Sequence, residues 1–396
     1  EMCIRDRPAA VRYPAKGETG RFDVDQSDII GPDKMVMPGS QHFLVLLAIW
    51  VGVFAVIGLF VALLVRFRRH RRGRPPKRPI ISGLLGATVV VCLVVGLVNK
   101  PSSFFVPEFP PLPRLFPEET FLYRQTTDVA VLPQSAEMVA ALGSAPIGAG
   151  AQGEVRGGIA WGFPFNFVDE STPRHRMNMT YEQASDDVAY PVSDPAYVQS
   201  MPSLGIDNHY IAIDLEAGRM WELWAIRNWF GRWAAGSGAE WDLTSSNYAK
   251  GSAVASGLPI MPMTYTYAEV ESGSIDHVLS AATSQGAPTW VWPARHSDGP
   301  SEDPDAPPMG TWLRLKPDAD LSALGPQART IATAMQDYGI VITDTTSGFG
   351  LAGTPDARWD DDDLATLRTL STVDLEVIDS SSLMVSEDSM AAVPPG

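Results

Sequence analysis

The chain has 396 residues, of which 30 are Lys or Arg and 46 are Asp or Glu, so its net charge is −16. Residues 99–396 alone hold 16 basic and 39 acidic residues. A part this acidic repels phosphate backbones, which excludes nucleic acid as a partner and disfavours docking on anionic lipid. Both cysteines, Cys3 and Cys92, precede residue 99, so the acidic part forms neither a disulfide nor a thiolate metal site.

Two long apolar runs precede the acidic part. Residues 43–65 are 23 residues without a charge and residues 80–98 are 19, and each run is long enough to cross a bilayer as a helix. Residues 66–79 between them carry eight Lys or Arg and no acid, and such a loop stays cytoplasmic by the positive-inside rule. A cleaved signal peptide does not fit, because the first run is too long and a second follows it. The pattern predicts a multi-pass protein of the cell membrane, with residues 1–42, the main domain and both termini on the extracytoplasmic side; residues 1–7 are set apart as an artefact of translated sequencing reads.

The outline of two helices followed by a large outer domain resembles subunit II of the haem–copper oxidases. That resemblance implies a dinuclear copper site built from two Cys, two His and one Met in the outer domain. Residues 99–396 contain no Cys, which excludes this site and limits the resemblance to the anchor. No cofactor is expected.

Proline, glycine and polar residues divide the rest of the chain. Residues 99–118 contain six prolines, which favour extended geometry and predict a stalk that lies along the membrane interface or packs on the domain. Residues 143–158 are rich in Gly and Ala and predict a flexible loop. The polar residues 381–396 predict a disordered tail, which leaves residues 119–380 as the globular extracytoplasmic domain.

Within that domain, short strands alternate with turns. Residues 209–215 and 219–226 alternate apolar and polar positions around a Gly turn, which predicts a β-hairpin. Residues 326–337 predict a helix with Pro in its first turn, and residues 361–370 a second whose acidic start suits the helix dipole. Further strands are predicted at 311–315, 340–343 and 375–378. The fold class expected is a two-span transmembrane α-hairpin followed by an α+β, mainly-β extracytoplasmic domain, with a β-sandwich or barrel core and a few helices.

The first candidate for chemistry is the Asp207-Asn208-His209 segment at the entry to the hairpin. Positions two apart share a face of an extended strand, so the carboxylate of Asp207 and the imidazole of His209 are expected side by side. Such a pair orients an imidazole for base catalysis or supplies two metal ligands. The structural alternative is an Asp turn cap beside a hydrogen-bonded His.

The second candidate is the segment from Trp290 to His296. Trp290 and Trp292 share a strand face and suit a flat platform for sugar rings, while Arg295 and His296 stand at a strand end, where loops gather binding groups. A core Trp pair followed by an exposed basic turn explains the same residues. His277 is also a candidate for substrate binding, although a histidine among apolar neighbours is more often a hydrogen-bonded core residue.

Carboxylates form the third set, because two of them facing across a cleft are the machinery of glycoside hydrolysis. Asp242 and Asp344 rank highest, since each ends an apolar stretch beside small polar residues; Asp214 and Glu222 follow. Each also fits a turn cap or a solvated face. No metal is expected, because a site would need most of the four histidines beyond the anchor: His175, His209, His277 and His296.

An ordered string of motifs, DNHYIAIDL, WDLTS, ASGLPIMP, WPARH, PPMGTWLRLK and YGIVITD, runs from the hairpin toward the C-terminal end. It resembles a family of secreted bacterial proteins, largely of unassigned activity, over residues 130–380. The resemblance implies an extracytoplasmic protein, with carbohydrate-binding modules in some relatives. Within 145–160, relatives have a more polar segment, so the Gly-rich stretch here weighs against enzymatic activity in this member. The positions that match the family are Asp207, His209, Asp242, His277, Arg295, His296 and Asp344.

These observations lead to the expectation of an extracytoplasmic protein that acts on or binds polysaccharide of the cell envelope or the environment. If it is hydrolytic, the catalytic cleft is expected to contain Asp207, His209, Asp242, His296 and Asp344, with Arg295, His277, Trp290 and Trp292 binding substrate. The competing expectation is a non-catalytic envelope protein with a binding or structural role. The oligomeric state does not follow from the sequence.

Overall fold

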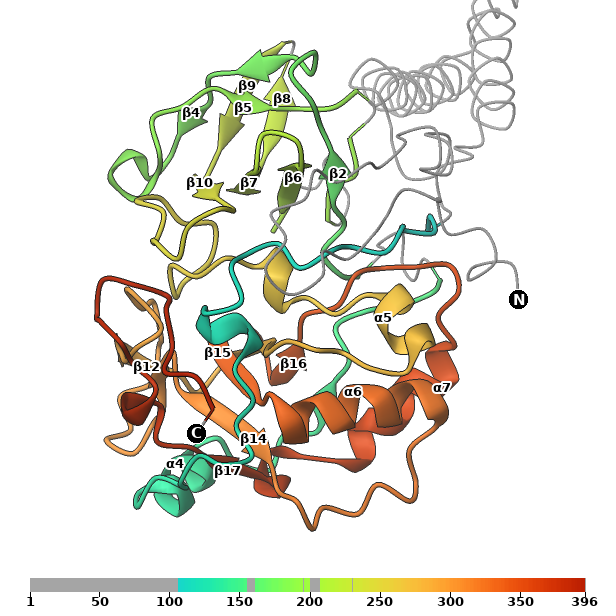
Figure 1. The fold of residues 1–396 in the computed structure, drawn as a ribbon, viewed down its shortest axis with the longest axis vertical. Coiled ribbons are helices and arrows are strands. Elements are labelled where there is room, and N and C mark those ends of the chain that lie inside the picture. The colour runs from blue at the N-terminus through green and yellow to red at the C-terminus, as the bar shows by residue number, and fades with distance from the viewer. Residues whose placement is uncertain (1–105, 155–160, 195, 200–206, 230, 396) are drawn as a thin grey trace, which may run out of the picture. The chain divides into compact units, whose positions relative to one another are not determined.

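The computed structural model describes residues 106–154, 161–194, 196–199, 207–229 and 231–395 (Figure 1). Among these residues no helix is long and apolar enough to cross a membrane, and the longest, α6 (Pro326–Asp337), has 12 residues. The expected fold class is therefore corrected: the fold described is a mainly-β domain without a two-span hairpin. The predicted spans at 43–65 and 80–98 lie outside the described residues.

The largest sheet has six strands in the order β1-β16-β11-β15-β14-β17. β11 runs parallel to β15, and β1 runs parallel to β16, while the remaining neighbours are antiparallel. The predicted strands at 311–315, 340–343 and 375–378 are confirmed as β14, β15 and β17. The strand bounds are β1 Ile147–Gly148, β16 Phe349–Leu351, β11 Leu279–Thr283, β15 Ile340–Asp344, β14 Trp312–Leu315 and β17 Leu375–Val377.

Helix α6 covers this sheet and confirms the prediction at 326–337 (Figure 1). Pro326 occupies its first turn, where a missing N–H costs nothing. Ile331 and Met335, four residues apart, lie on one face and are fully buried. They join a mostly aliphatic core with Leu313 and Ile340, which we call the aliphatic core.

The other helices are short. The segment predicted as a helix at 361–370 is α7 (Asp361–Ala365), which continues as a 3-10 turn. Its N-cap, Asp360, accepts hydrogen bonds from two backbone N–H groups of the first turn. The remaining α-helices of the described residues are α4 Ser135–Ala141, on β17, and α5 Tyr267–Ser272, beside α6. Among the same residues, 3-10 helices occur at Phe121–Tyr123, Glu182–Ala184, Met261–Met263, Thr366–Thr369, Thr372–Asp374 and Ser380–Ser382.

A second sheet has four strands in the order β10-β7-β6-β2. β6 (Tyr210–Asp214) and β7 (Arg219–Trp224) pair antiparallel, which confirms the predicted hairpin. β10 (Ser237–Asp242) pairs antiparallel with β7, and the two-residue β2 (Asn166–Phe167) pairs parallel with β6. Because side chains alternate along a strand, the faces of β7 differ. Trp221 packs with Tyr190 and Tyr210 in what we call the aromatic core, and Glu222 faces the opposite side.

Smaller sheets complete the architecture. β12 (Ala287–Trp290) pairs with β13 (Pro308–Met309), and β3 (Arg174–His175) with β5 (Tyr190–Pro191). A three-stranded sheet contains β4 Asn178–Met179, β9 Arg232–Ala235 and β8 Arg227–Trp229. The expected β-sandwich or barrel core is thus corrected, because the described strands form open sheets and the two largest sheets pack on separate cores.

The segments predicted as stalk and tail pack on the domain where they are described. Phe109 and Phe116 are buried, and the N–H of Phe109 donates to Asp356 at 2.9 Å, which agrees with the second of the two alternatives for the stalk. In the tail, Met390 is buried and its N–H donates to the carbonyl of Ser246. The prediction of a disordered tail is therefore wrong for residues 381–395, because Leu383, Met390 and Ala392 are buried, although Val385 and Val393 stay exposed.

Candidate active site

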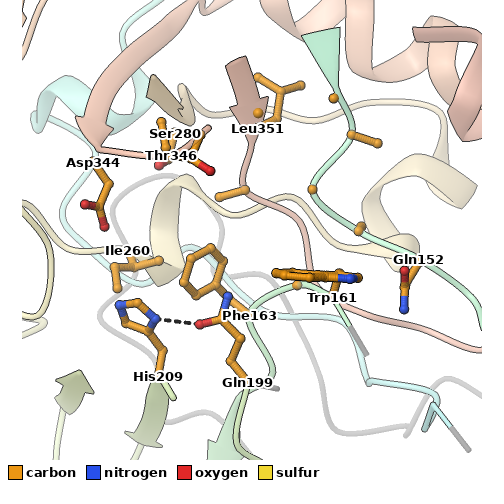
Figure 2. Close-up of a pocket in the computed structure, with 18 of the residues that line it drawn as sticks. Gln152, Trp161, Phe163, Gln199, His209, Ile260, Ser280, Asp344, Thr346 and Leu351 are labelled. Carbon is orange, nitrogen blue, oxygen red and sulfur yellow. Dashed lines mark hydrogen bonds between the residues drawn. The ribbon is translucent and has the colours of Figure 1, made fainter. Parts of the chain in front are cut away.

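A cavity of about 420 Å³ is lined by residues of the six-stranded sheet and by residues of the segment that leads into β6 (Figure 2). Asp207 and His209 come from the approach to β6, and Asp344 comes from the end of β15. The cavity therefore brings together three of the five residues predicted as catalytic. Further lining residues include Gly150, Gln152, Trp161, Phe163, Gln199, Ile260, Ser280 and Thr343.

Asp344 is the most perturbed acid of the cavity. Burial raises its pKa to about 7, and the nearby charges of Asp298 and Asp207 add to the rise. Its Oδ1 accepts a hydrogen bond from the N–H of Thr345 at 2.8 Å, which opposes the rise. Figure 2 shows the carboxyl group directed toward Ile260 and His209. A carboxyl group with this pKa exchanges a proton near neutral pH, which a general acid or base requires.

His209 is held as a neutral, structural histidine. Its Nε2 lies 3.0 Å from the carbonyl oxygen of Ala253, and its Nδ1 lies 2.6 Å from the position assigned to Oε1 of the Gln199 amide. The carbonyl can only accept, so the proton is on Nε2, and Nδ1 accepts once the amide is turned so that its NH₂ group faces the ring. Burial lowers the pKa of His209, which also favours the neutral form. Because both ring nitrogens are hydrogen-bonded, His209 lines the cavity as a structural residue.

Asp207 reaches the cavity from a strained turn. Its φ is +53°, a left-handed conformation that Asp tolerates better than most residues. Its Oδ1 accepts from the indole N–H of Trp224 at 3.0 Å and lies 3.8 Å from Nδ1 of His209. The expected Asp207–His209 neighbourhood is therefore present, but Gln199 is the direct partner of the imidazole. The carboxylate of Asp207 remains 55% exposed, accessible to a ligand.

The Gly-rich segment predicted as a flexible loop forms a wall of the cavity where it is described. Ile147 and Gly148 pair with β16, and Gly150 follows with a φ of +69°. A Cβ at Gly150 would lie 1.7 Å from the carbonyl oxygen of Leu351, so only glycine fits this approach of two backbones. The prediction of flexibility is wrong for residues 143–154, while 155–160 lie outside the described residues.

Two aromatic residues of the cavity were not predicted. Trp161 is 49% exposed, and Figure 2 shows its ring at the cavity beside Gln152. Phe163 meets the ring of His209 edge-on, with the centroids 5.0 Å apart. The signal for them was the aromatic run WGFPFNF that directly follows the Gly-rich segment.

A pair of buried hydroxyls on adjacent strands lies near Asp344. Ser280 of β11 and Thr343 of β15 place their hydroxyl oxygens 2.6 Å apart. Thr343 also lies 3.3 Å from the carbonyl of Ala281, to which it donates. Ser280 therefore donates to Thr343, and both hydroxyls are held in fixed orientations at the cavity wall.

Two predicted catalytic residues do not line the cavity. Asp242 ends β10 and accepts from the N–H and the hydroxyl of Thr244 at 3.0 and 2.7 Å. These hydrogen bonds lower its pKa, with a contribution from Arg219, so Asp242 is a turn cap. His296 is half-buried beside Gly257, burial lowers its pKa, and it is not among the residues that line the cavity.

The residues predicted to bind substrate are dispersed. His277 donates from Nδ1 to the carbonyl of Val278 at 2.8 Å, and its Nε2 lies 3.2 Å from Glu269. Burial acts to lower the pKa of His277, but the charge and hydrogen bond of Glu269 outweigh it, and the pKa is raised. Arg295, Trp290 and Trp292 surround a different hollow. Trp290 is exposed and Trp292 is buried, so they do not form the predicted two-ring platform.

Within the described part of the chain, no cluster of three or more His, Cys, Asp or Glu side chains has an arrangement that would hold a metal ion. No family model, curated protein or solved structure matches this chain.

Proposed function

We propose that the cavity binds a glycan and hydrolyses a glycosidic bond, with Asp344 as the proton donor. The observation that carries the proposal is an acid with a pKa of about 7 that shares a cavity with a second, accessible carboxylate, Asp207. Glycoside hydrolysis uses such a pair, one protonated and one ionised. Asp344 suits the protonated role, because it is the more buried of the two and burial raises its pKa.

In the proposed reaction, protonated Asp344 gives its proton to the oxygen of the leaving sugar as the bond to the anomeric carbon breaks. A water molecule adds to that carbon, and Asp207 accepts the proton that the water loses. Trp161 offers an exposed ring on which a sugar can stack, and the Ser280–Thr343 pair offers hydroxyl oxygens. His209 takes no part in proton transfer, because both of its nitrogens are engaged.

One observation favours a second function, glycan binding without cleavage. Asp207 accepts a hydrogen bond from Trp224, and His209 is fully partnered, so the only strongly activated group among the predicted residues of the cavity is Asp344. A binding site needs the cavity and Trp161 but no second proton-transfer group. The two functions differ in whether sugar is released.

The test measures reducing-sugar release by the full chain from a panel of neutral and acidic polysaccharides, together with retention in gels that contain them. We expect release to fall with rising pH through about 7, as Asp344 loses its proton. Asp344→Asn should lower release at least 100-fold and leave retention in place. Asp242→Asn is the matched control, because Asp242 is a turn cap that does not line the cavity.

Retention without release, unchanged in Asp344→Asn, would replace the hydrolytic function by the binding function. The absence of both release and retention with every polysaccharide would reject both.

A further inference from the structure

We infer that the hollow around Trp290 is a second, non-catalytic site that binds pyranose rings of a neutral polysaccharide. The inference rests on the proposed function in taking a glycan as the ligand. The hollow has a volume of about 660 Å³ and shares no lining residue with the Asp344 cavity. Its lining includes Trp290, Trp292, Arg295, Asp379, Glu387 and Asp388.

Trp290 presents an open aromatic face. It ends β12 with 54% of its surface exposed. No other aromatic ring of the described residues packs on its indole. A large ring that is left exposed suits stacking on the C–H face of a sugar, since the ligand removes apolar surface from water. A core role does not explain an indole in this position.

The support beneath Trp290 is rigid. The N–H of Val291 donates to the carbonyl of Met309 at 2.9 Å. The indole N–H of Trp292 donates to the carbonyl of Ser389 at 3.0 Å, and its ring packs edge-on against Phe121. The backbone that carries Trp290 is thus held before a ligand arrives, so little backbone freedom is lost on binding.

The carboxylate of Asp379 can accept hydrogen bonds from the hydroxyls of a sugar. Oδ1 of Asp379 accepts from the N–H and the hydroxyl of Ser381 at 3.1 and 2.5 Å. These bonds orient the carboxylate through its Oδ1. Among the described residues, none donates a hydrogen bond to its Oδ2. An oriented acceptor beside an aromatic ring is the combination that a pyranose, with hydroxyls at its edge and C–H groups on its face, requires.

The charges at the hollow select a neutral ligand. Asp379, Glu387 and Asp388 line it, and the only basic lining residue is Arg295. Arg295 is itself held by Asp388 at 3.1 Å and by the carbonyl of Glu387 at 2.5 Å. An acidic polysaccharide would meet uncompensated carboxylates, whereas a neutral one would not.

The experiment uses the full chain carrying Asp344→Asn, so that the ligand is not consumed, with soluble neutral polysaccharides as gel-embedded probes. Adding Trp290→Ala should weaken retention about tenfold, and Trp290→Phe should restore part of it. Val373→Ala is the control, because Val373 is an apolar residue that is 47% exposed and lines neither the hollow nor the Asp344 cavity. In the hydrolytically competent chain, Trp290→Ala should lower the ratio of polymer to short-oligosaccharide hydrolysis by a similar factor.

Equal retention of the Trp290→Ala and control proteins, with Trp161→Ala weakened, overturns the inference and leaves the proposed function standing. Retention lost with Trp290→Ala supports the inference, and if the chain with Asp344 intact also releases no sugar, the hydrolytic function alone is rejected. Stronger retention by acidic than by neutral polysaccharides also overturns it.

Discussion

The six-stranded and four-stranded sheets are stabilised by different kinds of buried side chain. The aliphatic core behind the first is built from residues such as Leu313, Ile331 and Ile340, whose burial has no directional requirement. Around the second, buried rings carry polar tips that are individually satisfied: the indole N–H of Trp241 donates to Glu222 at 3.0 Å, and the hydroxyl of Tyr190 donates to the carbonyl of Asp186 at 2.8 Å.

The candidate site takes one wall from each kind of structure. Asp344 ends a strand whose preceding residues are all buried in the six-stranded sheet, so its position follows from non-directional packing. His209 depends on Gln199 and Ala253, and Asp207 depends on Trp224. The wall with Asp207 and His209 is thus specified by hydrogen bonds, and is therefore more sensitive to single polar substitutions than the wall with Asp344.

Glu222→Ala should have the largest effect on stability. Its carboxylate accepts from the N–H groups of Ile260 and Met261 at 2.8 and 2.9 Å and from Trp241. Removal leaves three buried donors without a partner, for a loss of about 3–5 kcal/mol. The free energy of unfolding is measured by denaturant titration at pH 6, below the pKa of about 7 to which burial raises Glu222. Little charge is then removed with the side chain.

Glu216→Ala, in the exposed turn of the same hairpin, is the control for Glu222→Ala and should change stability by less than about 0.5 kcal/mol. Equal losses of unfolding free energy in the two variants would show that the buried hydrogen bonds of Glu222 stabilise this sheet no more than an exposed turn residue does. Because Ile260 also lines the cavity, we expect Glu222→Ala to weaken ligand binding as well.

Ile331→Ala tests the aliphatic core. The side chain is fully buried between α6 and the six-stranded sheet, and its truncation should cost about 3 kcal/mol through lost burial and the remaining cavity. Unlike the effect of Glu222→Ala, this loss should be the same at pH 5 and pH 8, since no titratable group is involved. Unfolding titrations at both pH values check it, with Thr330→Ala on the solvent side of α6 as the control. A loss that varies with pH would contradict the distinction between the two cores.

The parts of the fold that could be predicted have local signals. The β6–β7 hairpin alternates apolar residues around a Gly turn, and α6 repeats them at helical spacing after a Pro. The parallel pairing of β1 with β16 joins residues about 200 positions apart through strands of two and three residues, too short to show a period. The tail was predicted as disordered from its polar residues, although Leu383, Met390 and Ala392 are buried and anchor it.

The candidate site was predicted only in part for the same reason. Asp207, His209 and Asp344 stood beside recognisable strands, which made them visible. Whether Asp242 or Asp344 faces a cavity depends on which sheet each strand joins, and Trp161 reaches the site from a segment without regular structure. Electrostatic context was also missing, since the raised pKa of Asp344 results from burial by residues distant in sequence.

Asp344→Asn should stabilise the protein at alkaline pH, by the smallest of the three effects on stability. The pKa of Asp344 is raised from 3.8 to about 7 in the folded chain. A group whose folded pKa is raised contributes stability that is fully present below about pH 4 and is lost as the pH rises through about 7. Asn carries no charge and retains an oxygen that can accept from the N–H of Thr345. The half-buried position of Asp344 reduces the expected gain at pH 8 to about 1–2 kcal/mol.

Thermal unfolding of the Asp344→Asn and parent proteins from pH 4 to pH 9 tests this. The difference in melting temperature should be near zero at pH 4, grow up to about pH 7 and stay constant above it. Asp242→Asn serves as the opposite control: hydrogen bonds from Thr244 lower the pKa of Asp242, so its substitution should destabilise slightly at neutral pH. If Asp344→Asn is less stable than the parent at pH 8, burial does not destabilise the ionised Asp344 carboxylate of the parent. The raised pKa that the proton-donor role requires would then have no physical basis. A gain in melting temperature that appears only above pH 4 would instead show that the six-stranded sheet places Asp344 where its ionised form is destabilising.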